Sequence, residues 1–274
     1  MTGAAAPSAQ RIDAAALAHF AEHGALRVPG LLDPALVGSV YDLAADVLRA
    51  EGVLADDTWS GPLADAALQS RLNKILKGRM KHARALAALL TPELLTCVDA
   101  LVEGRETHGF GDPPLPQLLF SAPDAETWAV PHGMWHLDHP RGAEPGSPGV
   151  QAFLFLAPTP PGGGGTLVLE GSHRLLNDVG FLPSREVKRG LAREPALKPL
   201  FDARLQERSA LRDAVFEVDG VVLRVRELVG DPGDVWFTDL RVLHTLAPNA
   251  SAAPRLMATE RFMIGTRGEG AAPT

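Results

Sequence analysis

The feature that most constrains the fold is a change of hydrophobic periodicity near residue 110. Before it, apolar residues recur at helical spacing, as in the runs 13–24 and 33–52. After it, short apolar runs bounded by proline and glycine indicate buried strands joined by turns, as in 115–120 and 151–156. Helices followed by many short strands predict an α+β protein whose strands close into a double-stranded β-helix, the jelly roll.

Capping residues place the helix boundaries. Asp13 and Asp33 can cap helices, Pro34 and Pro92 suit a first helical position, and Gly24 can end a helix. We therefore expect helices over 13–24, 33–52, 68–76 and 91–102, and strands over 25–28, 115–120, 151–156, 166–169, 221–228, 234–238, 243–246 and 256–264.

The chain is expected to form a single domain over residues 1–274, with a mainly helical part at 1–110 and a jelly-roll core at 111–265. Residues 174–213 carry charges of both signs and form an insertion with helical stretches at 185–191 and 205–214. The insertion is either a lid over the mouth of the barrel or a solvated surface excursion.

Composition limits the partners. Hydrophobic residues make up 46% of the chain and charged residues 22%, which is ordinary for a globular protein with a core. A net charge of −7 gives no electrostatic footprint for nucleic acid. We expect a small-molecule substrate, no nucleic-acid partner and no membrane partner, and the oligomeric state stays open.

The single cysteine, Cys97, lies in an apolar helical run and is expected to be a buried small hydrophobe. It cannot form an internal disulfide, which favours a reducing compartment. The N-terminus lacks a signal-peptide pattern, and no run of about 18 apolar residues predicts a membrane span. A cytoplasmic location is the expectation.

His136 and Asp138 are two residues apart, a spacing that on a strand points both side chains to one side. With His244 they supply two imidazoles and a carboxylate, which can hold Fe(II) on one face and leave the other open for substrate and O₂. Arg255 follows His244 by eleven residues, and its planar fork suits a carboxylate. Because jelly-roll strands pair across the barrel, these residues can meet, with Arg255 on the strand neighbouring that of His244.

The sequence resembles the phytanoyl-CoA dioxygenase family of Fe(II)/2-oxoglutarate oxygenases over most of its length. The matching segments, in family order and spacing, are DAAALAHFAEHGALRVPGLLDP, WHLD, VQAFLFLAPTPPGGGGTLVLEGSH and GDVWFTDLRVLHTLAPNASAAPR.

The resemblance implies that His136, Asp138 and His244 bind iron and that Arg255 binds the distal carboxylate of 2-oxoglutarate. It also makes other residues candidates for contact with this cosubstrate: Phe153, Gln117, Thr166 and Ser251. The implied reaction consumes O₂ and 2-oxoglutarate, releases succinate and CO₂, and oxidises an unactivated C–H bond. Related halogenases carry a small residue in place of the carboxylate, so Asp138 favours a hydroxylase-type reaction over halogenation.

Two other functions remain open. Met134 to His139 fall one residue short of the His-x-His-x-Asp-His run of metallo-β-lactamase-like zinc hydrolases, because Met134 stands at the first histidine position and is a poor zinc ligand. A metal-binding jelly-roll enzyme that does not use 2-oxoglutarate is the second alternative. Arg255 disfavours it, since a buried guanidinium without an anionic partner is costly.

Overall fold

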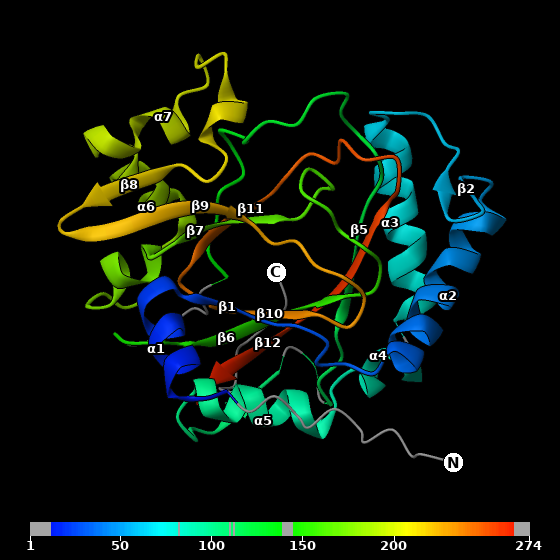
Figure 1. Cartoon of the computed structure of the whole chain (residues 1–274), viewed down its shortest axis with the longest axis horizontal. Coiled ribbons are helices and arrows are strands. Elements are labelled where there is room, and N and C mark those ends of the chain that lie inside the picture. Colours follow the sequence, from blue (N-terminus) through cyan, green and yellow to red (C-terminus); the bar gives the residue numbers. More distant parts are fainter. Residues whose placement is uncertain (1–11, 82, 110, 112, 139–144, 266–274) are drawn as a thin grey trace.

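A computed structural model describes residues 12–81, 83–109, 111, 113–138 and 145–265. Two antiparallel sheets form its centre (Figure 1). The larger sheet has the order β1 (Ala25–Val28), β10 (Val235–Asp239), β6 (Gly149–Phe155), β12 (Arg255–Ile264) and β4 (Thr107–His108), and β5 (Gln117–Ser121) also pairs with β12. The smaller sheet has the order β11 (Leu243–Leu246), β7 (Thr166–Glu170), β9 (Val221–Glu227) and β8 (Val215–Val218).

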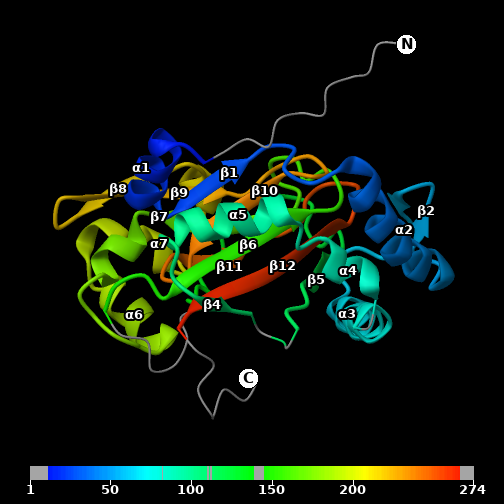
Figure 2. The same ribbon diagram turned by 90° about the horizontal axis from the view of Figure 1, so that it is seen from below.

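Two groups of helices lie at opposite sides of the view in Figure 1. Near one end, α2 (Pro34–Ala50), α3 (Ala66–Met80) and α4 (Arg84–Ala88) lie beside a short hairpin of β2 (Leu54–Ala55) and β3 (Thr58–Trp59). At the other end lie α6 (Ser184–Leu191) and α7 (Lys198–Phe201) of the insertion, and Figure 2 shows α5 (Pro92–Leu101) crossing the larger sheet. The remaining helix is α1 (Ala14–His23).

Strand alternation sorts the buried side chains into three apolar layers. One face of the larger sheet, including Leu154 and Phe237, packs against helices α2 to α5. The opposite face contributes Phe153 and Met257 to an interior cluster that also contains Val168 of the smaller sheet. The outer face of the smaller sheet is covered by the insertion. Two facing sheets around a closed interior are the double-stranded β-helix expected from the sequence.

Local sequence explains the helix ends. The Asp13 carboxylate accepts a hydrogen bond from the backbone N–H of Ala16, and the N–H of Gly24 closes α1 by donating to the carbonyl of Phe20. Gly24 has a φ of 69°, and an added Cβ would lie 2.4 Å from Nδ1 of His173, so glycine is required there. His173 also bonds the carbonyl of Ala21 at 3.1 Å through Nε2, and it thereby fastens α1 to the barrel.

Most expected elements are present, but the end of the insertion differs from the sequence prediction. The helical stretch expected over 205–214 is only a 3-10 helix, η3 (Arg208–Leu211), and an edge strand that was not expected, β8, follows it. Two causes are visible. Arg208 donates to the carbonyls of Pro199, Leu200 and Asp202, which curls the chain around its guanidinium. Asp213 then adopts a left-handed φ of 56°, which a helix does not allow.

The insertion also contains the short 3-10 helix η2 (Pro195–Leu197), and a further one, η1 (Ser172–Leu176), begins directly after β7. In α6 the charged residues face outward while Val187 and Leu191 are buried. Both apolar residues join the cluster on the outer face of the smaller sheet. The insertion is therefore packed against the barrel. Cys97 is buried as expected, and burial raises the pKa of its thiol. Every helix in the described part of the chain is too short or too polar to span a lipid bilayer.

Asp234 supports the turn that enters β10. Its carboxylate accepts hydrogen bonds from the backbone N–H of Gly30 at 2.8 Å and of Asp231 at 2.9 Å, and it pairs with Arg27. Burial raises the pKa of Asp234, but these hydrogen bonds and the Arg27 charge outweigh burial and lower it below its ordinary value.

Asp234→Asn should destabilise the protein by about 1.5–3 kcal/mol near pH 7, because hydrogen bonds to a charged acceptor are lost. Since the folded-state pKa is depressed, the carboxylate contributes its full stability above the unfolded pKa of about 3.9 and loses it as the pH falls through the folded value. Urea denaturation of both proteins should therefore show a difference that shrinks below about pH 4. A constant difference at all pH values would contradict this assignment.

Candidate metal centre

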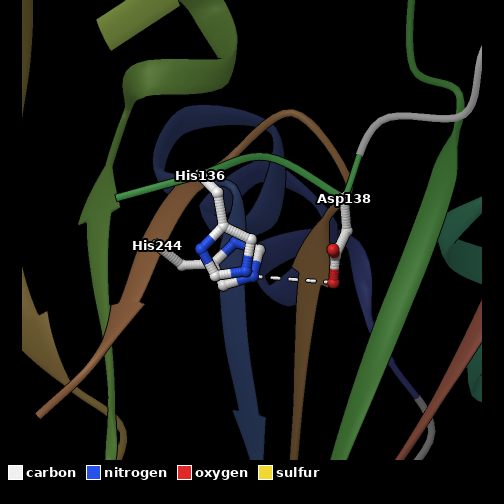
Figure 3. A group of neighbouring side chains, drawn as sticks. All are labelled: His136, Asp138 and His244. Carbon is white, nitrogen blue, oxygen red and sulfur yellow. Dashed lines mark ion pairs between the residues drawn. The ribbon is translucent and has the colours of Figure 1, made fainter. Parts of the chain in front are cut away.

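Three potential metal ligands converge at the edge of the smaller sheet. The backbone N–H of His136 donates to the carbonyl of His244 at 2.8 Å, and the reverse bond measures 2.9 Å. This antiparallel bridge brings the two imidazole rings to a centroid distance of 4.2 Å. Asp138 turns its carboxylate toward the rings from the same segment as His136 (Figure 3). One ligand atom from each residue lies within 4.8 Å of the others.

The backbone orients both imidazoles. Nδ1 of His136 lies 2.8 Å from the carbonyl of Met134, and Nδ1 of His244 lies 3.0 Å from the carbonyl of Val242. A carbonyl accepts only, so each Nδ1 carries the proton and each Nε2 keeps its lone pair. A second hydrogen bond of this kind fixes the tautomer and direction of metal-binding histidines. Met134 itself has a φ of 60°, and its side chain is exposed.

The charges around Asp138 favour the ionised carboxylate. Its Oδ2 lies 2.7 Å from Nη2 of Arg261 and 3.5 Å from Nε2 of His244. Burial raises the pKa of Asp138, but His244 in its protonated form, as hydrogen-bond donor and charge, and the Arg261 charge together hold it well below its usual range. Burial and the neighbouring His244 lower the pKa of His136. An ionised carboxylate and a neutral imidazole are the forms that bind metal.

Arg255 is a buried cation with an incomplete set of partners. Its side chain is 3% exposed, and its Nη1 donates to Sδ of Met257 at 3.7 Å. Within the described residues, its Nε has no hydrogen-bond partner, and no carboxylate forms an ion pair with the guanidinium. Burial lowers the pKa of Arg255 to about 10, while the charge of Asp124 raises it. The guanidinium is therefore preorganised for an anion.

Arg255 does not lie on a strand adjacent to that of His244, contrary to the expectation from the sequence. β12 belongs to the larger sheet and β11 to the smaller sheet, so Arg255 and His244 stand on different sheets. The eleven-residue connection passes from one sheet to the other. Asn249 supports this connection: its Nδ2 donates to the carbonyl of Ala253 at 2.9 Å and to that of Ser121 at 3.3 Å.

The other predicted cosubstrate contacts are scattered. Phe153 lies in the interior, with its ring 6.4 Å from that of His244 and nearly perpendicular to it. Thr166 is buried at the start of β7. Gln117 is exposed and lines a small hollow with Thr259 and Arg261. The hydroxyl of Ser251 lies 2.7 Å from Oδ1 of Asn249 within its own turn. Cosubstrate contact by these four residues stays a prediction.

Arg261 was not identified from the sequence, although a signal was present. It lies six residues after Arg255 on β12, and an even separation puts both side chains on the same face of a strand. Carrying the alternation from Arg255 to the end of the strand would have placed a second arginine toward the barrel interior. Its proximity to Asp138 depends on the tertiary structure.

No protein-family model matches the sequence, and the search of characterised proteins found no similar one. The fold is similar to that of solved structures. The SnoK structure, a non-heme alpha-ketoglutarate-dependent carbocyclase from nogalamycin biosynthesis, matches with a TM-score of 0.58 and 16% identity over 95% of this chain and 87% of that one.

EctD from S. alaskensis, crystallised with 2-oxoglutarate and 5-hydroxyectoine, matches with a TM-score of 0.56 and 18% identity over 95% of this chain and 79% of that one. AviO1 from Streptomyces viridochromogenes Tue57 matches with a TM-score of 0.53 and 20% identity over 98% and 99% of the two chains. The chain therefore has the cupin-like jelly-roll fold of these solved structures.

Proposed function

We propose that this protein is an Fe(II)- and 2-oxoglutarate-dependent oxygenase related to the phytanoyl-CoA dioxygenase family. It would oxidise an unactivated C–H bond of a small molecule, consume O₂ and 2-oxoglutarate, and release succinate and CO₂. We assign His136, Asp138 and His244 to the metal and Arg255 to the distal carboxylate of the cosubstrate. The whole chain would act as one catalytic domain.

The observation that carries the proposal is the buried Arg255 guanidinium, which lacks a carboxylate partner in the described part of the chain while sharing the barrel with the His136, Asp138 and His244 side chains. A desolvated cation of this kind is costly unless an anion completes it. A dicarboxylic acid that binds the metal through one end would bring its distal carboxylate to Arg255 and so supply that anion. The matched EctD structure was crystallised with 2-oxoglutarate in the same fold.

The donor set also fits Fe(II). Two imidazoles with free Nε2 atoms and one carboxylate are the ligands of the 2-His-1-carboxylate centre of non-heme Fe(II) oxygenases. When bound, iron and 2-oxoglutarate supply the oxidising chemistry. The protein residues orient the metal ligands, clamp the acid and exclude water from the apolar interior around Phe153. Asp138 occupies a ligand position that a halogenase needs free for chloride, which supports a hydroxylase-type reaction.

Anaerobic addition of Fe(II) and 2-oxoglutarate to the metal-free protein tests the proposal. We expect a weak visible charge-transfer band from the chelated cosubstrate, and slow succinate formation without substrate once air is admitted. Succinate should not form when the metal is left out. Absence of the band in the wild-type protein would contradict the proposed function.

A zinc hydrolase remains the competing function, because two histidines and a carboxylate also bind zinc. In the described residues, the three side chains above form the sole cluster of this kind, and Met134 in the first histidine position is 80% exposed. Zinc-dependent cleavage of an ester or lactam, without the visible band, would favour the hydrolase.

A further inference from the structure

We propose that Ser184, the first residue of insertion helix α6, is a positioning residue for the metal centre. The inference rests on the proposed function, because it concerns how the chain holds the ligands of that centre. It gives the 174–213 insertion a specific role, which is to fix the backbone between His136 and Asp138.

Ser184 makes two hydrogen bonds to one residue. The backbone N–H of Leu137 donates to Oγ of Ser184 at 3.0 Å, and the Ser184 hydroxyl donates to the carbonyl of Leu137 at 3.3 Å. Leu137 stands between two of the metal ligands. The N–H and carbonyl of His136 are already paired with His244, so those of Leu137 point to the opposite edge of the segment. Ser184 therefore takes the place of a neighbouring strand at this edge.

The other ligand-bearing strand is held in a related way. The backbone N–H of Leu243, the residue before His244, donates to Oγ of Ser172 at 2.9 Å, and Ser172 is fully buried. Ser172 and Ser184 both lie in the chain that follows β7. Each hydroxyl thus fixes a residue adjacent to a metal ligand, and the His136–His244 bridge joins the two held strands.

The insertion is anchored firmly enough for this role. Arg208 donates to the carbonyl of Val130 through Nε, and the N–H of Val130 donates to the carbonyl of Arg208 at 3.4 Å. Leu137 belongs to the same apolar cluster as Val187 and Leu191 of α6. The 130–138 segment is therefore attached to the insertion by side-chain packing and by hydrogen bonds at both ends. This arrangement favours an insertion that holds the segment in place over one that moves as a lid.

Ser184→Ala, Ser184→Thr and Ser39→Ala separate this role from a general effect on stability. Ser39 is the matched control, because its hydroxyl donates to the carbonyl of Leu36 on an exposed helix face. Co(II) alone is the probe, titrated below the unfolding transition of every variant and followed by its visible absorption. We expect Ser184→Ala to weaken Co(II) binding by about 10- to 100-fold, the range for groups that support metal ligands. The Ser39→Ala variant should bind as the wild type does, and the Ser184→Thr variant should recover most of the affinity.

Hydrogen exchange on the metal-free proteins provides a second, metal-independent measurement. The amide of Leu137 should exchange about tenfold faster in Ser184→Ala than in the wild type, since its acceptor is lost. Unchanged Co(II) affinity with unchanged exchange would overturn the positioning role. Faster exchange with unchanged affinity would also overturn it, because Ser184 would then be merely structural. Failure of the wild-type protein to bind Co(II) would instead contradict the proposed metal centre and the inference that rests on it.

Discussion

Replacing Arg255 by methionine should remove high-affinity binding of 2-oxoglutarate while leaving the protein as stable as before or more stable. The two effects have opposite signs because the guanidinium is 3% exposed and has no carboxylate partner in the described part of the chain. Loss of a buried charge pair at a binding site costs about 2 kcal/mol or more, which is at least about a 30-fold rise in Kd. Removal of the unpaired charge should leave stability unchanged or raise it by about 1–4 kcal/mol.

Anaerobic titration with 2-oxoglutarate, on variants that hold the same amount of metal as the wild type, would measure its affinity. Urea denaturation would measure the stability. Arg255→Lys is the informative companion, because it keeps the charge and loses the planar fork. The 2-oxoglutarate affinity of this variant should lie between those of the wild type and Arg255→Met. Equal 2-oxoglutarate affinity in Arg255→Met and the wild type would refute the assigned role. A large loss of stability would show instead that the guanidinium serves the fold.

Replacing Asp138 by alanine should abolish metal binding and all metal-dependent turnover. The carboxylate is the anionic member of the proposed ligand set, and its loss leaves two neutral imidazoles. We expect metal affinity to fall by more than the roughly 10- to 100-fold that is typical for groups supporting the ligands. The wild-type protein should gain about 2.7 kcal/mol of stability at a free metal concentration of about 100 times Kd, and the variant should gain none.

Co(II) titration and thermal unfolding with and without metal would check this result. Asp46→Ala is a suitable control, since Asp46 is an exposed carboxylate on α2 that pairs with Arg49. It should keep the wild-type response to metal. A metal-induced stabilisation that survives in Asp138→Ala would place the ion elsewhere.

The elements with strong local signals were predictable from the sequence. The Asp13 cap and Gly24 bound α1, and the β1 and β11 strands have the expected limits of 25–28 and 243–246. In each case, capping chemistry or a short apolar run agrees with the tertiary environment. The three metal-ligand candidates could also be selected, because ligand type, a two-residue spacing and chain order coincide.

Other features depend on contacts that no local pattern encodes. The 205–214 stretch has helical composition, but the Arg208 side chain donates hydrogen bonds to the backbone carbonyls of Val130 and Leu200, and these contacts prevent a full helix. Ser184 resembles any serine at the start of a helix, and its bonds to Leu137 exist only after the insertion folds back. The placement of Arg255 on the opposite sheet follows from the path of the connection from β11.

The division of the site between two sheets has a consequence for selectivity. His244 stands on the smaller sheet and Arg255 on the larger one, with Phe153 and Met257 packed in the interior between the sheets. In the proposed site, the space between the metal and the Arg255 guanidinium would therefore be set by close-packed side chains, which yield little. This spacing would select diacids by the length of their carbon chain. A change in that selectivity would therefore require substitutions in the core between the sheets, and a new loop would not suffice.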